Sequence, residues 1–173
     1  MSGDIIKVIS LTQPWATLCA ISTPDEPAKD IETRSWSTSY RGPLGIHAAK
    51  GFPKWAQALC DEEPFKSRLQ GLKAKDLPRG VLLCVRSLEK CVSTDGVIGP
   101  MRKMLPILFK ENMQPITWME QQFGDYSDGR YAWFLGPVTR VFDPPFPVMG
   151  ALGLWNLVGT GQVVQAKGMA WVL

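Results

Sequence analysis

Short apolar segments, separated by turns rich in glycine and proline, recur along the 173-residue chain and limit the folds open to it. The strongest strand pattern is VLLCVRSLEKCV at 81–92, because its apolar start is nearly continuous. The other predicted strands are residues 5–11, 29–36, 43–49, 131–142 (interrupted at Gly136-Pro137) and 151–158, with one more edge strand in 163–173. The proline-rich segment 143–150 is predicted to be a rigid loop. This spacing favours a small β-barrel over parallel βαβ units, so we predict an α+β fold.

Helical patterns lie between these strands. Residues 12–21 carry apolar side chains at helical spacing, beginning at Trp15. Residues 52–72 show a second helical pattern, with Trp55 on the expected buried stripe and a break at Pro64. Short helices therefore surround the predicted barrel.

One stretch differs in composition from the rest. Residues 94–123 are rich in Met, Pro, Lys and Gln, and we predict a helical insertion with short helices at 101–112 and 116–123. The length of the chain favours one domain over residues 1–173, with 159–173 as a C-terminal extension.

The cysteines and the chain start favour a reduced, cytoplasmic setting. The four cysteines contain no C-x-x-C pair, and the first residues lack the pattern of a secretion signal. No apolar run approaches the roughly 18 residues of a membrane span, so no membrane association is expected. The net charge of +3 permits an acidic partner such as a nucleic acid without requiring one.

Charged and aromatic side chains are concentrated in residues 29–50. This stretch contains Lys29, Glu32, Arg34, Trp36, Tyr40, Arg41, His47 and Lys50. Burying unpaired charge is costly, so a functional site is a better prediction here than a plain core strand. Strand alternation places Glu32 and Arg34 on one face, and Lys29 meets Glu32 only from the preceding loop or from a bulge.

The acidic and basic residues of this stretch have two interpretations. A lysine beside a carboxylate acts as a nucleophile or base when burial lowers its pKa, and the carboxylate then transfers protons. Lys29 and Glu32 are the candidate catalytic residues on this hypothesis. The same two residues with Arg34 also fit a structural ion-pair network, and the spacing leaves both interpretations open.

The cations and aromatic rings of the stretch also fit single-stranded nucleic acid. The candidate phosphate-binding residues are Arg34, Arg41 and Lys50, and the candidate base-stacking residues are Trp15, Trp36 and Tyr40. Stacking on an aromatic ring contributes about 1–3 kcal/mol per base. The alternative is a solvated strand edge with Trp36 in the core.

Four polar residues outside the stretch are further candidates. The segment GDYSDGRYAW, residues 124–133, has the composition of a tight turn before a strand, which is the favoured interpretation. The functional alternative places Ser127, Arg130 and Tyr131 at the rim of the same cleft. Gln13 is a candidate for orienting a bound substrate.

No metal or cofactor set is evident in the sequence. His47 is the only histidine, and it is expected to be structural, since no Cys, His or acidic cluster has metal-ligand spacing. The glycine-rich phosphate loops and the G-x-S-x-G pattern do not occur. We therefore expect no cofactor, with a divalent metal entering only if the protein is a nuclease.

Several separated blocks of the chain carry a family resemblance. In order they are SLTQPWATL, KDIETRSWSTSYRGPLGIHAAKGFP, LPRGVLLCV, FGDYSDGRYAWFL and GALGLW, which together span roughly residues 5–158. They resemble an ASCH (activating signal cointegrator homology) domain. The family motif G-x-K-x-x-E-x-R is matched at Lys29, Glu32 and Arg34, with Pro27 at the glycine position. The resemblance implies a PUA-like small β-barrel surrounded by short helices, with a cleft beside the motif.

The same resemblance implies two kinds of function, binding and hydrolysis, and the composition of the insertion suggests a further hypothesis. ASCH domains are generally regarded as modules that bind RNA or single-stranded nucleic acid, which is the function that we predict. Some members are similar to enzymes: a divalent-metal ribonuclease, and an amidohydrolase of acetylated cytidine with Thr where this chain has Glu32. A protein-interaction adaptor that uses the insertion 94–123 is the third hypothesis.

Overall fold

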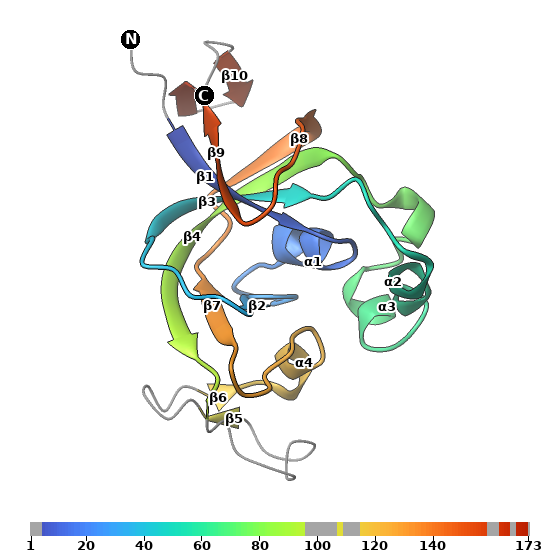
Figure 1. Cartoon of the computed structure of the whole chain (residues 1–173). Helices are drawn as coiled ribbons and strands as arrows, with labels where there is room; N and C mark the ends of the chain where they lie inside the picture. Colours follow the sequence, from blue (N-terminus) through green and yellow to red (C-terminus); the bar gives the residue numbers. More distant parts are fainter. Residues whose placement is uncertain (1–4, 96–106, 109–114, 159–162, 167–168, 173) are drawn as a thin grey trace. The chain divides into compact units, whose positions relative to one another are not determined.

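Seven strands form one mixed sheet in the computed structural model of this protein (Figure 1). The structure describes residues 5–95, 107–108, 115–158, 163–166 and 169–172. The strands of the sheet are β1 (Ile5–Leu11), β2 (Ile31–Arg34), β3 (Gly42–Ala48), β4 (Val81–Ser93), β7 (Tyr131–Leu135), β8 (Arg140–Pro147) and β9 (Leu154–Val158). Their order is β2-β7-β4-β3-β1-β9, with β8 also paired to β4. The predicted α+β class is confirmed, whereas the pairings described do not close the sheet into a barrel.

The remaining elements are short. The helices are α1 (Trp15–Ile21), α2 (Lys54–Leu59), α3 (Phe65–Arg68), the 3₁₀ turn η1 (Ala74–Asp76) and α4 (Trp118–Gln121). Two small antiparallel pairs are β5 (Ile107–Leu108) with β6 (Pro115–Ile116), and β10 (Val163–Ala166) with β11 (Met169–Val172). Among the described residues, no helix combines the length and the apolar character needed to cross a membrane.

The chain forms two compact units, and β4 contributes to both. Unit 1 contains residues 1–20, 43–86 and 138–173, and unit 2 contains residues 21–42 and 87–137. The prediction of a single domain with a C-terminal extension stays a prediction.

The sheet of unit 1 is centred on β1. This strand pairs in parallel with β3 and antiparallel with β9, and the first half of β4 pairs antiparallel with β8. The apolar side chains of Val8, Leu82, Val85 and Phe142 form a buried cluster between these strands. Gly45 on β3 lies where an added Cβ would be 3.0 Å from side-chain atoms of Val8 and Leu82, so a larger residue there would have to displace these packed side chains by a few tenths of an ångström.

Unit 2 is built around an antiparallel strand pair. β2 pairs with β7, and β7 pairs with the second half of β4. The core cluster of this unit contains Ile31, Val92, Ile116, Tyr126, Ala132 and Phe134. Along β2, Ile31 and Thr33 are buried while Glu32 and Arg34 are partly exposed, which confirms the predicted alternation.

Four local predictions need correction. Residues 143–147 of the expected loop belong to β8, because an edge strand accepts proline where its N–H would be unpaired. The tail forms two paired strands rather than one edge strand. Residues 107–108 are a strand, not a helix, while the helix predicted at 116–123 is confirmed as α4. The rest of the predicted helix at 101–112 lies outside the described residues.

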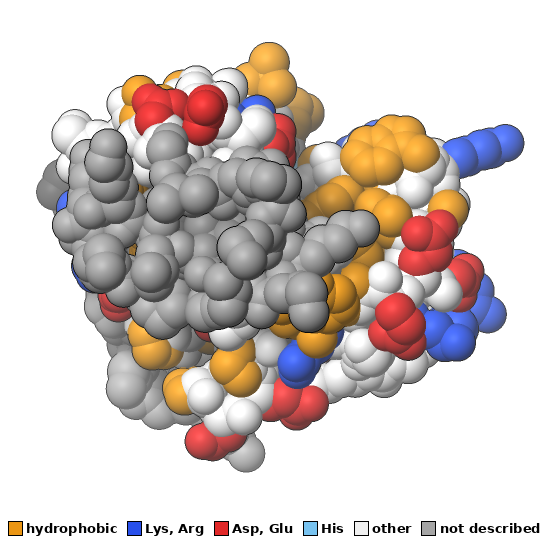
Figure 2. Space-filling model, turned by 90° about the horizontal axis from the view of Figure 1, so that it is seen from below, with side chains coloured by type: hydrophobic (Ala, Val, Ile, Leu, Met, Phe, Trp, Pro, Cys, Tyr) orange, Lys and Arg blue, Asp and Glu red, His pale blue; other side chains and the backbone are white. Residues whose placement is uncertain are grey.

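The fourth correction concerns Trp55, which is 63% exposed rather than buried. The helical pattern at 52–72 is interrupted as predicted, but α2 and α3 are too short to form one continuous stripe. Figure 2 shows exposed hydrophobic side chains next to charged ones on the side of the molecule where α2 and α3 lie.

Candidate functional site

Lys29 is the centre of a buried polar cluster in unit 2. Its side chain is 0% exposed and lies just before β2. The ammonium group donates to the backbone carbonyls of Ile31 and Phe123, the second at 3.2 Å, and pairs with Glu32 Oε2 at 3.3 Å. A lysine ammonium has three donors. Three acceptors therefore surround the amine that the catalytic hypothesis needs as a nucleophile or base.

Glu32 joins this lysine to a more exposed arginine. Glu32 Oε1 lies 3.2 Å from Nε of Arg34, and the two side chains are 14% and 26% exposed. Lys29 lies in the loop before β2, which is one of the two positions from which we predicted that it could reach Glu32. Strand alternation therefore does not separate the two side chains. The K-x-x-E-x-R motif is therefore a continuous charge network that ends at the surface of unit 2.

Glu120 is a member of the cluster that the sequence analysis missed. Its carboxylate accepts hydrogen bonds from the backbone N–H groups of Asp30 at 2.8 Å and Ile31 at 3.0 Å. Burial raises the pKa of Glu120, opposed by the charge of Lys29 and by these two bonds. The pattern Thr117-x-x-Glu120 is a capping box in sequence, and Thr117 Oγ1 does accept from Glu120 N at 3.1 Å. The Glu120 side chain, however, reaches the start of β2 instead of its own helix.

Tyr126 is the buried aromatic residue of the same cluster. Burial raises its pKa well above the ordinary value, and the charges of Glu120 and Glu32 add to this effect. The tyrosine therefore stays protonated near neutral pH. One lysine, two glutamates and this phenol thus lie together, an arrangement that ties β2 to the segments after α4.

The aromatic and basic residues after β2 lie in unit 2 as well. Trp36 packs edge-to-face on the fully buried Trp133, with ring centroids 4.7 Å apart, and its carbonyl accepts from Trp133 Nε1 at 3.4 Å. Trp36 is itself only partly buried. The exposed guanidinium of Arg41 donates to the carbonyls of Thr38 and Tyr40, so the chain turn holds this cation at the surface.

The second predicted cluster is largely occupied by turn contacts. Arg130 pairs with Asp125 at 3.3 Å and donates to its carbonyl at 3.2 Å. The Ser127 carbonyl accepts from Thr94 Oγ1 at 2.7 Å, while its N–H donates to Asp125. Tyr131 begins β7 and is partly buried. These contacts are typical of a tight turn, which is one of the two interpretations given for residues 124–133 from the sequence.

Gln13 and Trp15 belong to unit 1. Gln13 is fully buried; its amide donates to the carbonyl of Pro78 at 2.8 Å and accepts from Thr17 N at 3.0 Å. Trp15 packs against Trp55 and Phe65, with ring centroids 5.9 and 5.6 Å apart. Gln13 thus fixes the start of α1, and Trp15 contributes one face of a partly exposed aromatic cluster.

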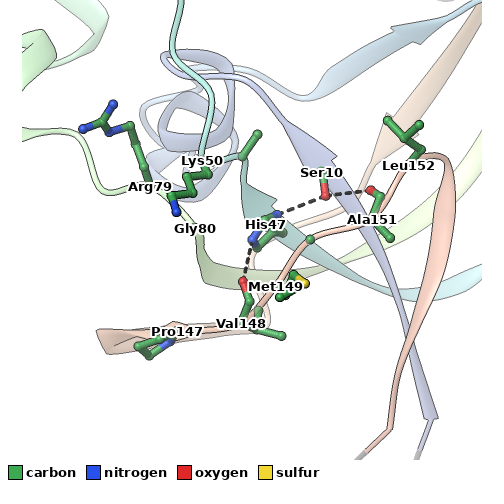
Figure 3. Close-up of a pocket in the computed structure, with 12 residues that line it drawn as sticks. Ser10, His47, Lys50, Arg79, Gly80, Pro147, Val148, Met149, Ala151 and Leu152 are labelled. Atoms are coloured by element: carbon green, nitrogen blue, oxygen red, sulfur yellow. Dashed lines mark hydrogen bonds between the residues drawn. The ribbon is translucent and has the colours of Figure 1, made fainter.

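A pocket of about 730 Å³ lies entirely within unit 1 (Figure 3). Its lining residues are Ser10, His47, Ala49, Lys50, Arg79, Gly80, Pro147, Val148, Met149, Gly150, Ala151 and Leu152. Figure 3 shows Lys50 and Arg79 on one side of His47 and the loop 148–152 on the other. Lys50 was predicted as a site residue, whereas Arg79 and the loop were not.

The charges of this pocket have one sign. Its lining contains Lys50 and Arg79, both exposed, and no aspartate or glutamate. His47 is 2% exposed, and burial lowers its pKa from 6.5, opposed by its bond to the Val148 carbonyl. The loop adds the exposed apolar side chains of Met149 and Leu152. The pocket can therefore hold an anion that also has an apolar face.

A smaller pocket of about 330 Å³ in unit 2 has the opposite character. It is lined partly by Asp30, Glu89 and the buried Glu120, with Lys90 as its cation. The mainly acidic lining disfavours a phosphate there. Across the parts of the chain that the structure describes, no three His, Cys, Asp or Glu side chains are gathered as metal ligands. The divalent-metal hypothesis stays a prediction.

The cysteines do not add a nucleophile to either pocket. None of the four belongs to a disulfide, and Cys19, Cys60 and Cys84 are buried. Burial raises the pKa of Cys84 to about 12, opposed by the charge of Arg86. A thiol in this environment stays protonated and unreactive at neutral pH.

Comparison of the sequence with models of known protein families gives no match. Comparison with curated proteins finds no significant similarity either. The ASCH resemblance therefore has the five sequence blocks as its support, and the geometry of the site is the basis for a functional proposal.

Proposed function

We propose that this protein binds RNA or single-stranded nucleic acid, with phosphate groups in the pocket of unit 1. The observation that carries the proposal is the sign of the pocket charge: Lys50 and Arg79 line it without an acidic side chain. Lysine and arginine are the usual phosphate-binding residues in proteins.

The size and the apolar loop support a nucleotide as the occupant. Ligand sites commonly measure about 300–1,000 Å³, and this pocket lies in that range at about 730 Å³. Met149 and Leu152 are 91% and 98% exposed, on the loop that lies across His47 from the two cations. A nucleotide presents an anionic phosphate and an apolar base face, which match these two parts of the pocket.

The other predicted nucleic-acid contacts extend the proposal to unit 2. Arg34, Arg41, Trp36 and Tyr40 are all at least partly exposed, so they are accessible to a strand. The same proposal includes a PUA-like barrel and a single ASCH domain, both of which the resemblance implies. It also includes a cytoplasmic setting, which the cysteine pattern favours.

Hydrolysis of RNA or of a modified nucleoside by Lys29 and Glu32 is the alternative function. It has less support because the Lys29 amine is fully buried among two carbonyls and Glu32. Incubating labelled RNA with and without Mg²⁺ or Mn²⁺ tests it on the same samples, since cleavage changes strand length and binding does not.

Reversing the pocket charges tests the proposal directly. Lys50→Glu and Arg79→Glu are each expected to weaken binding of a labelled mixed-sequence RNA by roughly tenfold, because each removes a phosphate contact and adds repulsion. Fluorescence anisotropy measures the affinities. Lys73→Glu is the matched control, since Lys73 is exposed in unit 1 and pairs with Asp61 away from the pocket. Unchanged affinity in both pocket variants would contradict the proposal.

A further inference from the structure

The loop 148–152 rests directly on the buried histidine of the pocket. An added Cβ on Gly150 would lie 2.4 Å from His47 Cε1, 2.7 Å from Nδ1 and 2.9 Å from Ser10 Oγ. Real side chains do not approach this closely, so only glycine allows the loop to lie in this position. The position of the loop therefore depends on the imidazole beneath it.

Hydrogen bonds fix the two ends of this loop. At one end, Val148 N donates to the Gly80 carbonyl at 3.2 Å, and the Val148 carbonyl lies 3.1 Å from His47 Nε2. At the other end, the Ala151 carbonyl accepts from Ser10 Oγ at 3.1 Å. Ser10 Oγ also lies 3.0 Å from His47 Nδ1 (Figure 3). Both ends are thus connected to the same imidazole.

Counting protons shows that this network depends on the charge of His47. A carbonyl only accepts, so Nε2 must carry the proton toward Val148, and a neutral imidazole then has no proton on Nδ1. Trp155 Nε1 donates to Ser10 Oγ at 3.1 Å. The single Ser10 hydroxyl proton then serves either Nδ1 or the Ala151 carbonyl. A protonated imidazole donates from both nitrogens and leaves the hydroxyl proton for Ala151, so all four contacts are satisfied.

We propose that His47 is a positioning residue for the loop 148–152, and that its protonation both fastens the loop and strengthens anion binding in the pocket. The second half of this inference rests on the proposed nucleic-acid function. Protonation adds a positive charge beside Lys50 and Arg79. RNA affinity is therefore expected to rise as the pH falls.

The surroundings of His47 set the pH range of this effect. The charged groups in the pocket lining are Lys50 on the segment after β3 and Arg79 before β4, and the neighbours Ser10 and Trp155 are neutral. Burial lowers the pKa of His47 below 6.5, with the Val148 bond opposing. In the absence of an anion the imidazole is thus neutral at pH 7, and a bound phosphate, by linkage, raises its pKa.

Nuclear magnetic resonance tests, without any ligand, whether protonation of His47 fastens the loop 148–152. His47 is the only histidine in the chain, so its Cε1 proton signal reports one titration. The Met149 methyl signal and the Ala151 amide signal are expected to shift with the same midpoint, and His47→Gln is expected to remove that shared transition. Loop signals that do not follow the His47 midpoint would overturn the inference.

RNA affinity tests whether protonation of His47 strengthens anion binding in the pocket. For the unmodified protein we expect roughly tenfold tighter binding of the labelled RNA at about pH 5.5 than at about pH 7.5, and a flat profile for His47→Gln. The same pH ratio in both proteins would overturn the inference. Absence of RNA binding at every pH would overturn the proposed function and, with it, the inferred effect of His47 protonation on anion binding. The loop signals would still decide whether His47 positions the loop.

A glycine substitution provides a second test that holds even if the His47→Gln protein does not fold. Gly150→Ala keeps the imidazole but pushes the loop off it. A loop that protonation fastens must in turn favour the protonated imidazole, so losing the Val148 carbonyl is expected to lower the His47 pKa further below its ordinary value. Gly51→Ala is the control, because an added Cβ there meets nothing within 4 Å. An unchanged or raised His47 pKa in Gly150→Ala would overturn the inference.

Discussion

Replacing Lys29 with methionine is expected to lower the free energy of unfolding by about 3–5 kcal/mol, the usual cost of breaking a buried ion pair from one side. The fully buried amine serves the carbonyls of Ile31 and Phe123 and pairs with Glu32. Methionine fills a similar volume but leaves these acceptors without their donor. Urea unfolding followed by tryptophan fluorescence measures the loss.

The exposed pair of Lys73 and Asp61 provides the matched control. Their side chains are 49% and 69% exposed at a separation of 3.0 Å. Lys73→Met is expected to cost no more than about 1 kcal/mol, because solvent screens such a pair. A Lys29→Met protein that keeps its stability but loses metal-dependent RNA cleavage would contradict the structural role and favour the hydrolase alternative.

Removing the Glu120 carboxylate is expected to have the second large effect. Glu120→Ala leaves the N–H groups of Asp30 and Ile31 without their acceptor, and we expect a loss of about 2–5 kcal/mol. Glu63→Ala is the control, since Glu63 accepts one backbone N–H, that of Ser67, on the exposed surface. Equal losses in the two variants would contradict the role of Glu120 as a buried anchor for β2.

The pH dependence of stability gives Glu120 a separate signature. Its pKa is raised above the ordinary 4.5 by burial, so the folded protein holds this proton longer than the unfolded chain does. The stability that the protonated group contributes is present below pH 4.5 and is lost as the pH rises through the raised pKa. Glu120→Gln is expected to remove this part of the pH profile.

The strands and the motif could be predicted because their signals are local. Alternation along β2 correctly assigns Ile31 to the core and Glu32 to the opposite face, and the apolar run of β4 identifies a strand of the sheet. The ion pair of Lys29 with Glu32 needed only the position of the lysine in the preceding loop. Such features depend on neighbouring residues in the chain.

The parts that could not be predicted depend on distant contacts. Glu120 lies 90 residues after Asp30, and its capping-box pattern gives no indication that the carboxylate leaves its own helix. The DPPFPVMG segment is typical of a loop, but pairing with β4 makes 143–147 part of a strand. Likewise, Gly150 has no local signal for its contact with His47, more than 100 residues earlier.

The salt dependence of RNA binding tests the central claim most directly. Anisotropy titrations of a labelled mixed-sequence RNA over a series of salt concentrations give the slope of log K against log salt. Two phosphates held by Lys50 and Arg79 would give a negative slope with a magnitude of at least about 1.4, since each contact on a single strand contributes about −0.7. The expected result is a slope of at least this size, whose magnitude falls by about 1.4 in the Lys50→Glu, Arg79→Glu double variant. Binding with no salt dependence, or no binding at low salt, would contradict the proposed nucleic-acid site.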